Sequence, residues 1–396
     1  MKTMTSRDRF QTALDLGVPD RVPMLDYIDE KVILGMAEIM GLSRGKEAVA
    51  TRKGEESKAF LDTYCDVIEA QDHDATWLSY STGLKRVTED WGVDKYGRGF
   101  MLSKNGIPAV MEGGIKTIED LKGYRMADRV SLEDFEGAAY VIDKLGRDRS
   151  HVLSMNGPFQ EAWLIRGGMD KLMYDYSLDP ELAHAVSREV VEFNKRIINM
   201  CAEIGIDVVS FDGDMAGNMT TLMSLDHFHE FILPYKQELC DYVHEKGLQV
   251  FKHCDGVVWP ILDVFVESHF DGLHPIQPQC MHIGATKQYL KGKMCVVGNI
   301  DCLDLLVFGN PDQVEEAVYE TIQMAAPEGG YILASSNSLH PGCKPENAIR
   351  MFEAARKYGH YKDIPDKMSP QPDPPKVPGI GEKPRERRHR RRAKRK

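Results

Sequence analysis

The stretch from Leu248 to Pro278, LQVFKHCDGVVWPILDVFVESHFDGLHPIQP, decides the fold class of this chain. A β-branched apolar run ends in His253-Cys254-Asp255-Gly256, a helix-like segment follows, and a second short run ends in His274-Pro275. Titratable side chains therefore stand where two runs, interpreted as buried strands, stop. In a parallel α/β barrel the loops after the strands build the active site. Taken alone, the stretch is equally compatible with two ordinary strand ends followed by polar loops.

Short apolar runs rich in β-branched residues recur beyond this stretch. Each ends in Gly, Asn, Asp or Ser, and the runs are HVLSMNGP, IDVVSFDGD, LQVFKHCDG, FDGLHPI, MCVVGNID and GYILASSNS. Segments with helical periodicity lie between them, at residues 180–202, 225–245, 257–266, 311–326 and 345–358. Two of these segments begin with a capping side chain before proline, at Asp179-Pro180 and Asn310-Pro311. Strand–helix alternation repeated this often indicates a parallel sheet.

The N-terminal part completes the set of strands. Residues 21–25 (RVPML) form a short apolar run that predicts the first strand. Residues 84–116 combine short alternating runs with turn residues, which predicts an inserted hairpin region in place of a barrel helix. With these units about eight strands fit, so we predict an α/β fold of the (β/α)8 TIM-barrel type. A doubly wound open sheet is the alternative, and no GxGxxG motif follows the first strand to support it.

Composition points to a soluble enzyme. The 396 residues are 42% hydrophobic and 28% charged, as in globular proteins. No window is apolar enough for a membrane helix, and the first residues lack the apolar core of a signal peptide. The eight cysteines are scattered without a CxxC pair. We therefore expect a cytoplasmic protein with reduced thiols.

The net charge of −11 is divided unevenly along the chain. Residues 369–396 hold eleven Lys/Arg and three Asp/Glu, a net charge of +8, so residues 1–368 carry −19. We predict one barrel domain over 1–368 and a disordered, Pro-rich and then polybasic tail over 369–396. The acidic body argues against a nucleic acid substrate. The tail is interpreted as a solvated appendage, with contact to nucleic acid, a membrane surface or an acidic partner as alternatives.

Polar and titratable side chains follow each predicted strand, whereas the strands themselves are almost free of charge. The residues are Asp26, Tyr27, Asn156, Gly157, Pro158, Glu161, Asp212, Asp214, His253, Cys254, Asp255, His274, Asn299, Asp301, Cys302, Ser335, Ser336, Asn337 and His340. Burying charge is costly unless the charge is paired or metal-bound. A cluster of this density therefore predicts a polar catalytic pocket.

Two pairs of these residues are candidates for specific chemistry. His253 and Asp255 are two apart and would face the same side of an extended strand. They could bind a divalent metal with a third ligand from another strand, form a pair for acid–base work, or simply satisfy each other. Asp212 and Asp214 also share a face, where paired carboxylates raise each other's pKa; capping the next helix is the alternative.

Several segments together resemble the uroporphyrinogen decarboxylase superfamily. They are SRDRFQTALDLGVPDRVPM, NGPFQEAWLIRGGMDKLMYD, KHCDGVVWPILD, DGLHPIQP, GNIDCLDLLVFGNPDQVEEAV and SSNSLHPGCKPENAIRMFEAARKYGH. The resemblance covers about residues 4–362 and rests on the ordered set of segments, because no single motif is decisive. It implies a single (β/α)8 barrel with its site at the carboxyl ends of the strands.

One branch of this superfamily, uroporphyrinogen decarboxylase itself, binds a substrate with eight carboxylates through an arginine-bearing loop after the first strand. The same position here reads LDYIDEK, which is acidic and has no arginine. An acidic site would repel such a substrate. The family's later Asn-Leu-Gly-His-Gly segment is replaced by SNSLHPG, with Asn337 where the histidine would fall. Both departures argue against haem synthesis.

The other branch comprises cobamide-dependent methyltransferases, some of which bind zinc through a His-x-Cys pair and a distant Cys. Here Asp255 and Asn337 stand at the two cysteine positions. The resemblance therefore implies a methyltransferase that moves a methyl group between a small methylated compound and a corrinoid held by a partner protein. A homodimer is the candidate oligomer. The alternatives are uroporphyrinogen decarboxylase, in porphyrin synthesis, and a non-catalytic binding barrel that tethers a partner by its tail.

Roles follow from this resemblance. The residues expected in catalysis are Glu161, Asp212, Asp214, His253 and Asp255. The residues expected to contact substrate are Asp26, Tyr27, Asn156, His274, Asn299, Asn337 and His340. A metal, with zinc as the candidate, would be held by His253 and Asp255 with His274 or Cys302, and would act as a Lewis acid on the leaving heteroatom. Glu161 or Asp212 could instead protonate that atom.

Overall fold

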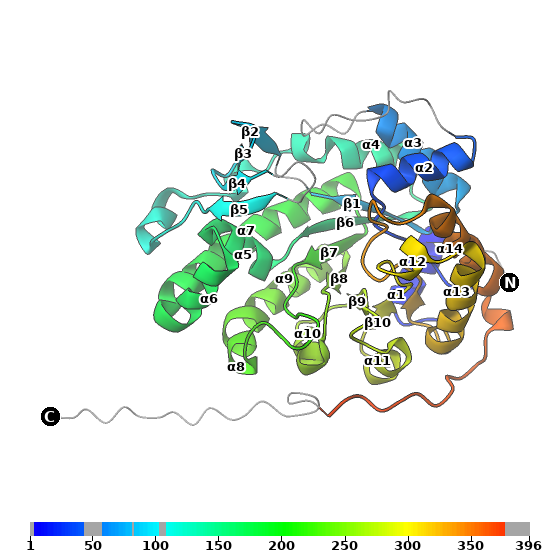
Figure 1. Cartoon of the computed structure of the whole chain (residues 1–396). Coiled ribbons are helices and arrows are strands. Elements are labelled where there is room, and N and C mark those ends of the chain that lie inside the picture. The colour runs from blue at the N-terminus through cyan, green and yellow to red at the C-terminus, as the bar shows by residue number, and fades with distance from the viewer. Residues whose placement is uncertain (1–3, 43–57, 81–82, 103–107, 377–396) are drawn as a thin grey trace.

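The computed structural model describes residues 4–42, 58–80, 83–102 and 108–376. Its main sheet has seven parallel strands in the order β1-β6-β7-β8-β9-β10-β11, curled and surrounded by helices (Figure 1). The strands are β1 (Ala75–Ser79), β6 (Ser150–Asn156), β7 (Val208–Asp212), β8 (Gln249–His253), β9 (Gly272–His274), β10 (Cys295–Val297) and β11 (Tyr331–Ile332). All six runs predicted from the repeating pattern are strands. The α/β barrel prediction is confirmed.

Residues 21–28 close the barrel between β11 and β1. The Leu25 amide donates to the Leu333 carbonyl at 3.2 Å, and the Asp74 amide donates to the Met24 carbonyl at 3.0 Å. This segment was predicted as the first strand, and it fills that place through isolated bridges only. The reason is Pro23, which has no N–H to give to a strand ladder. The strand that the sequence did not reveal is β1, whose five residues ATWLS hold one β-branched side chain.

The helices form the outer layer. They are α1 (Ser6–Leu14), α2 (Glu30–Ile39), α3 (Lys58–Ala70), α4 (Glu136–Leu145), α5 (Pro158–Arg166), α6 (Met169–Leu178), α7 (Pro180–Ile204), α8 (Leu225–His227), α9 (Leu233–Glu245), α10 (Leu262–Glu267), α11 (Ile283–Leu290), α12 (Leu305–Phe308), α13 (Pro311–Ala325) and α14 (Pro345–Tyr358). The predicted caps are confirmed, because Asp179 accepts from the Leu182 amide and Asn310 from the Gln313 amide. The helix predicted over 225–245 is interrupted by a π-helical turn, since Pro234 removes a backbone donor.

The predicted hairpin insertion is a four-stranded antiparallel sheet beside α5 and α7 (Figure 1). It does not take the place of a barrel helix as predicted, because α4 follows it before β6. Its strands are β2 (Leu84–Arg86), β3 (Trp91–Asp94), β4 (Gly99–Met101) and β5 (Ala109–Glu112). Arg98, in the turn between β3 and β4, forms buried ion pairs with Asp94 and with Glu161 of α5. The insertion is therefore anchored to the barrel by charge as well as by packing.

Helix α1 blocks the amino end of the barrel. Phe10, Ala13 and Leu14 are buried and belong to one apolar cluster with side chains from β1, β6, β7, β8, β10 and β11 and from the segments beside them. Those partners are Leu25, Ala75, Trp77, Val152, Val208, Phe251, Cys295, Val297, Ile332 and Ala334. With the amino end filled, the carboxyl ends of the strands carry the site. Within the described residues, no helix is long and apolar enough to span a membrane. Residues 369–376 of the predicted tail are without helix or strand, and 377–396 lie outside the described residues.

Candidate active site at the carboxyl ends of the strands

His253, Asp255 and Asp214 form a cluster that fits a metal ion. One ligand atom from each lies within 4.8 Å of the others. The Asp255 amide donates to Asp214 Oδ1 at 2.9 Å, which ties the loop after β8 to the loop after β7. Ligand distances of about 2.0–2.2 Å place ligand atoms roughly 3–4 Å apart, so small side-chain rotations would bring all three to one ion.

The surroundings of Asp255 support this fit. Its Oδ2 accepts from the Asn337 side-chain amide. Its Oδ1 is buried and has no hydrogen-bond partner in the described part of the chain. Burial raises the pKa of Asp255, and the charge of His253 opposes that rise. A buried carboxylate oxygen without a partner is costly, and a bound cation would remove the cost. One imidazole and two carboxylates suit Zn²⁺ and other divalent first-row metals.

The chain reaches this geometry through a glycine. Gly256 has φ +87°, and a Cβ there would lie 2.6 Å from the Gly217 carbonyl oxygen. The Val257 amide donates to the same carbonyl at 2.9 Å. Only glycine fits this left-handed, closely packed position, which turns the chain directly after Asp255 and keeps the two loops together.

His274 stands behind His253. The Nδ1 atoms of the two rings are 2.8 Å apart. His274 is fully buried, and burial followed by the charge of His253 holds its pKa well below the ordinary value, so its ring is neutral. Its Nε2 has no partner among the described residues. The contact fixes the ring of His253, as a hydrogen bond to a metal-binding imidazole does. The metal-capable cluster contains Asp214, and neither His274 nor Cys302 belongs to it.

Two predicted acids are held by other contacts. Asp212 accepts from the hydroxyls of Ser154 and Ser210, whereas Asp214 is exposed and turned toward β8. The two carboxylates therefore have separate partners. Glu161 is 1% exposed, and its oxygens accept from Arg98 and, at 2.8 Å, from the Asn156 amide. These contacts give Glu161 an anchoring role between barrel and insertion.

Asp26 lies under the loop after β11. It is 1% exposed and accepts from the Ser335 amide at 2.7 Å and the Ser335 hydroxyl at 2.9 Å. Burial raises its pKa to about 7, although these hydrogen bonds lower it. The neighbouring Tyr27 is 41% exposed and meets Trp77 edge-on at 6.4 Å. Trp77 in turn packs 4.9 Å from the His274 ring.

The remaining predicted residues contact the same loops. His340 Nε2 is 2.8 Å from the Cys302 carbonyl oxygen, and the Cys302 thiol accepts from the Ser336 hydroxyl at 3.4 Å. Asn299 donates to the Ile276 carbonyl at 2.8 Å and is buried. Its amide is therefore used within the protein.

A pocket of about 210 Å³ opens beside Asp255. Its lining residues are Asp255, Gln277, Cys302, Leu303, Ser336, Asn337, Ser338 and His340. No lysine or arginine belongs to this lining within the described residues. Gln277, Leu303 and Ser338 were not predicted. Each lies one to three residues beyond a residue named at a strand end, so the pocket reaches further along the loops than the predicted strand-end residues.

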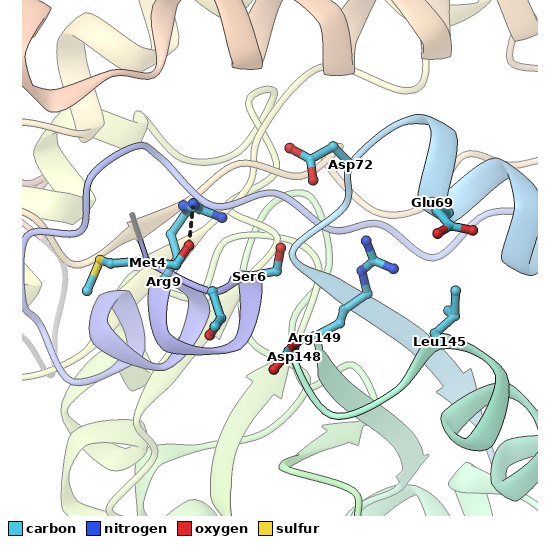
Figure 2. A pocket seen from close by; sticks show the side chains of 9 residues that line it. Met4, Ser6, Arg9, Glu69, Asp72, Leu145, Asp148 and Arg149 are labelled. Atoms are coloured by element: carbon cyan, nitrogen blue, oxygen red, sulfur yellow. Dashed lines mark hydrogen bonds between the residues drawn. The ribbon is translucent and has the colours of Figure 1, made fainter. Parts of the chain in front are cut away.

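A larger cavity of about 430 Å³ lies at the opposite end of the barrel, between α1, the end of α3 and the loop before β6 (Figure 2). The two arginines that line it are engaged within the protein: Arg9 contacts Asp20 and Asp74, and also the Met4 carbonyl. The Arg149 Nε donates to the His73 carbonyl. The metal-capable cluster lies at the carboxyl ends of the strands, beside the smaller pocket. We therefore take the smaller pocket as the candidate active site.

Sequence comparison identifies the family. The chain matches the uroporphyrinogen decarboxylase (URO-D) family over residues 93–358. The chain belongs to the URO-D family. The predicted resemblance is thus confirmed. A solved structure of a methyltransferase from Methanosarcina mazei, 22% identical, superposes with a TM-score of 0.71 over 90% of this chain and 99% of that one, which shows a shared fold.

Two methyltransferases and a uroporphyrinogen decarboxylase are among the relatives. A methylcobamide:CoM methyltransferase of Methanosarcina acetivorans is 24% identical over 63% of this chain and 72% of its own length. A methylated-thiol–coenzyme M methyltransferase of Methanosarcina mazei is 23% identical over 54% and 55%. A uroporphyrinogen decarboxylase of Alkalilimnicola ehrlichii is 21% identical over 50% and 53%. This chain thus spans about half the length of the last two relatives.

Proposed function

We propose that this URO-D family protein is a methyltransferase that moves a methyl group between a small methylated compound and a corrinoid carried by a partner protein. The main support for this proposal is the Asp214–His253–Asp255 cluster, which lies beside a small pocket. The similarity to two methyltransferases supports the branch. Action in the cytoplasm, as a homodimer, is part of the proposal.

The residues present divide the work. His253, Asp255 and Asp214 would hold a divalent metal, zinc being the candidate, and that metal would act as a Lewis acid on the heteroatom that loses or accepts the methyl group. Asn337 orients Asp255, and His274 orients His253. The hydroxyls and amides of Ser336, Ser338 and Gln277 would bind the polar part of the substrate.

Asp26 is the candidate acid. Its pKa of about 7, raised by burial, would let it hold a proton at neutral pH. One of its oxygens accepts from the Ser335 hydroxyl, and Ser335 is the neighbour of the pocket-lining Ser336, so this acid lies next to the pocket wall.

Uroporphyrinogen decarboxylase is the same-fold rival, and the pocket argues against it. A substrate with eight carboxylates requires cationic partners. The described lining holds the carboxylate of Asp255 and no lysine or arginine. The pocket of about 210 Å³ is also below the range of roughly 300–1,000 Å³ typical for drug-sized ligands.

The test incubates the purified full-length protein with reduced cobalamin and a panel of methylated ethers, thiols and amines, and follows methylcobalamin by its absorption. Transfer from at least one donor, lost in Asp255→Ala, is the expected result. Decarboxylation of uroporphyrinogen without any methyl transfer would replace the proposal by its rival. Absence of both reactions would favour a non-catalytic binding barrel.

A further inference from the structure

Lys252 is buried among backbone carbonyls next to the metal-capable cluster. It lies on β8, directly before His253, and its side chain is 0% exposed. Its Nζ donates to the Phe211 carbonyl at 3.0 Å, to the Gly213 carbonyl at 2.8 Å, and to the carbonyl of His253. An ammonium group has three donors, and all three are used.

These three carbonyls stand where the strand ladder between β7 and β8 ends. Phe211 and Gly213 flank Asp212 at the end of β7, and Gly213 directly precedes Asp214. Gly213 has φ +114°, so the chain leaves the strand conformation there. Beyond this point β7 and β8 no longer pair through regular ladder bonds. Lys252 therefore replaces ladder hydrogen bonds at the place where the two ligand-bearing loops begin.

Three other hydrogen bonds join the two loops near the cluster. The Met215 amide donates to the Cys254 thiol at 3.2 Å, the Asp255 amide donates to Asp214, and the Val257 amide donates to the Gly217 carbonyl at 2.9 Å, beyond the ligands. A sulfur acceptor is weak, and the second link involves a ligand that would move toward a bound ion. The ammonium of Lys252 is the strong, charge-assisted contact among them.

We propose that Lys252 is a positioning residue that sets the separation between Asp214 and the His253–Asp255 pair, and so presets the site for its metal. This inference rests on the proposed function, because it assumes that the cluster binds a cation. Lys252 touches neither the metal position nor the pocket. It acts through the backbone of Gly213, which directly precedes the ligand Asp214, and through the backbone of His253, itself a ligand.

A matched control exists at the other end of the barrel. Lys287 on α11 is 4% exposed, and its Nζ donates to the carbonyls of Gly329 and Gly330 before β11. It is also a buried lysine that binds backbone carbonyls where a strand meets its loop. Lys287→Met should therefore reproduce the general cost of removing such an ammonium, without affecting the cluster.

The experiment titrates Co²⁺ into the metal-free full-length protein and its variants, and records the dissociation constant and the visible absorption of bound Co²⁺. Thermal unfolding is measured for each metal-free variant. We expect Lys252→Met to weaken Co²⁺ binding roughly 10–100-fold and to change the spectrum, as loss of a supporting contact does. Lys287→Met should bind Co²⁺ within about twofold of the wild type while its unfolding temperature falls similarly.

Lys252→Gln keeps two N–H donors and should bind Co²⁺ more tightly than Lys252→Met but less tightly than the wild type. It replaces Lys252→Met in the comparison if that variant does not fold. Equal Co²⁺ affinity and spectrum in the wild type and both Lys252 variants would overturn the positioning role. An equal loss of affinity in Lys287→Met would also overturn it, because the effect would then be general destabilisation. A wild type that binds no Co²⁺ would refute the metal proposal itself.

Discussion

Asn337 donates its side-chain amide to the carboxylate of Asp255, joining the loop after β11 to the loop after β8 across 82 positions of sequence. By resemblance, these are the two positions at which zinc-dependent relatives carry cysteines. The contact places both positions side by side in this chain. The difference lies in the donor atoms, a carboxylate and an amide in place of two thiolates.

This relationship predicts that a thiolate site can be rebuilt. The double variant Asp255→Cys/Asn337→Cys would offer His253 and two thiolates, the soft donors that zinc favours. We expect its Zn²⁺ affinity to rise roughly tenfold or more over the wild type, measured by competition with a chromophoric chelator at pH 7. Each single variant should gain less. Lack of any gain in the double variant would mean that the two positions do not converge on the metal.

A second prediction concerns His274. His274→Phe keeps a ring against Trp77, 4.9 Å away, but removes the nitrogen that contacts His253. Metal affinity should fall roughly 10–100-fold, as measured by equilibrium dialysis. His73→Phe is the control, because His73 is also fully buried, neither of its ring nitrogens has a partner in the described chain, and it packs against Phe352. If both variants bind metal like the wild type, His274 does not orient His253.

A third prediction concerns pH. Burial raises the pKa of Asp26 from 3.8 to about 7. The folded state therefore binds this proton more tightly than the unfolded state, and the stabilisation from the protonated form is lost as pH rises from about 4 to about 7. The cost at pH 8 is at most ~4 kcal/mol. The Asp26→Asn variant cannot ionise at this position. Its free energy of unfolding minus that of the wild type should therefore be larger, meaning a relatively more stable variant, at pH 8 than at pH 5. A difference that is independent of pH would show that Asp26 does not titrate in this window.

A fourth prediction concerns the insertion. Arg98→Met would leave Asp94 and Glu161 buried without their cation. Breaking a buried pair in this way costs about 3–5 kcal/mol, which chemical denaturation would detect. Lys122→Met is the control, because its pair with Glu119 is largely exposed and should contribute at most about 1 kcal/mol. A similar small cost for both variants would contradict the anchoring role of Arg98.

Most strands and helices of the barrel could be predicted from the sequence, because the side-chain periodicity of a strand or helix is a local property. The run at 248–253 and the helix at 345–358 could be located from side-chain spacing alone. β1 could not, because ATWLS becomes a strand only through its register with β6, a long-range contact. The site shows the same division. His253 and Asp255 could be identified because they stand at the end of a predicted strand. The contact of Asp214 with the loop after β8 could not be predicted, because it depends on the turn at Gly213. The contacts of Lys252 depend in turn on where the carbonyls at the end of β7 lie.

The pocket lining predicts which methyl donors are used. Asp255 is its one carboxylate, and no lysine or arginine among the described residues faces it. Guaiacol and vanillate are methoxyphenols that differ by a carboxylate, and that anion would find no lysine or arginine in the described lining to pair with. Methyl transfer from guaiacol to reduced cobalamin should therefore exceed transfer from vanillate, in kcat/KM, by roughly tenfold or more, since a ratio of ten corresponds to about 1.4 kcal/mol. Ser338→Arg should narrow this ratio by adding the missing cation, whereas Ser338→Gln should leave it unchanged. Preference for vanillate in the wild type would refute this account of the pocket.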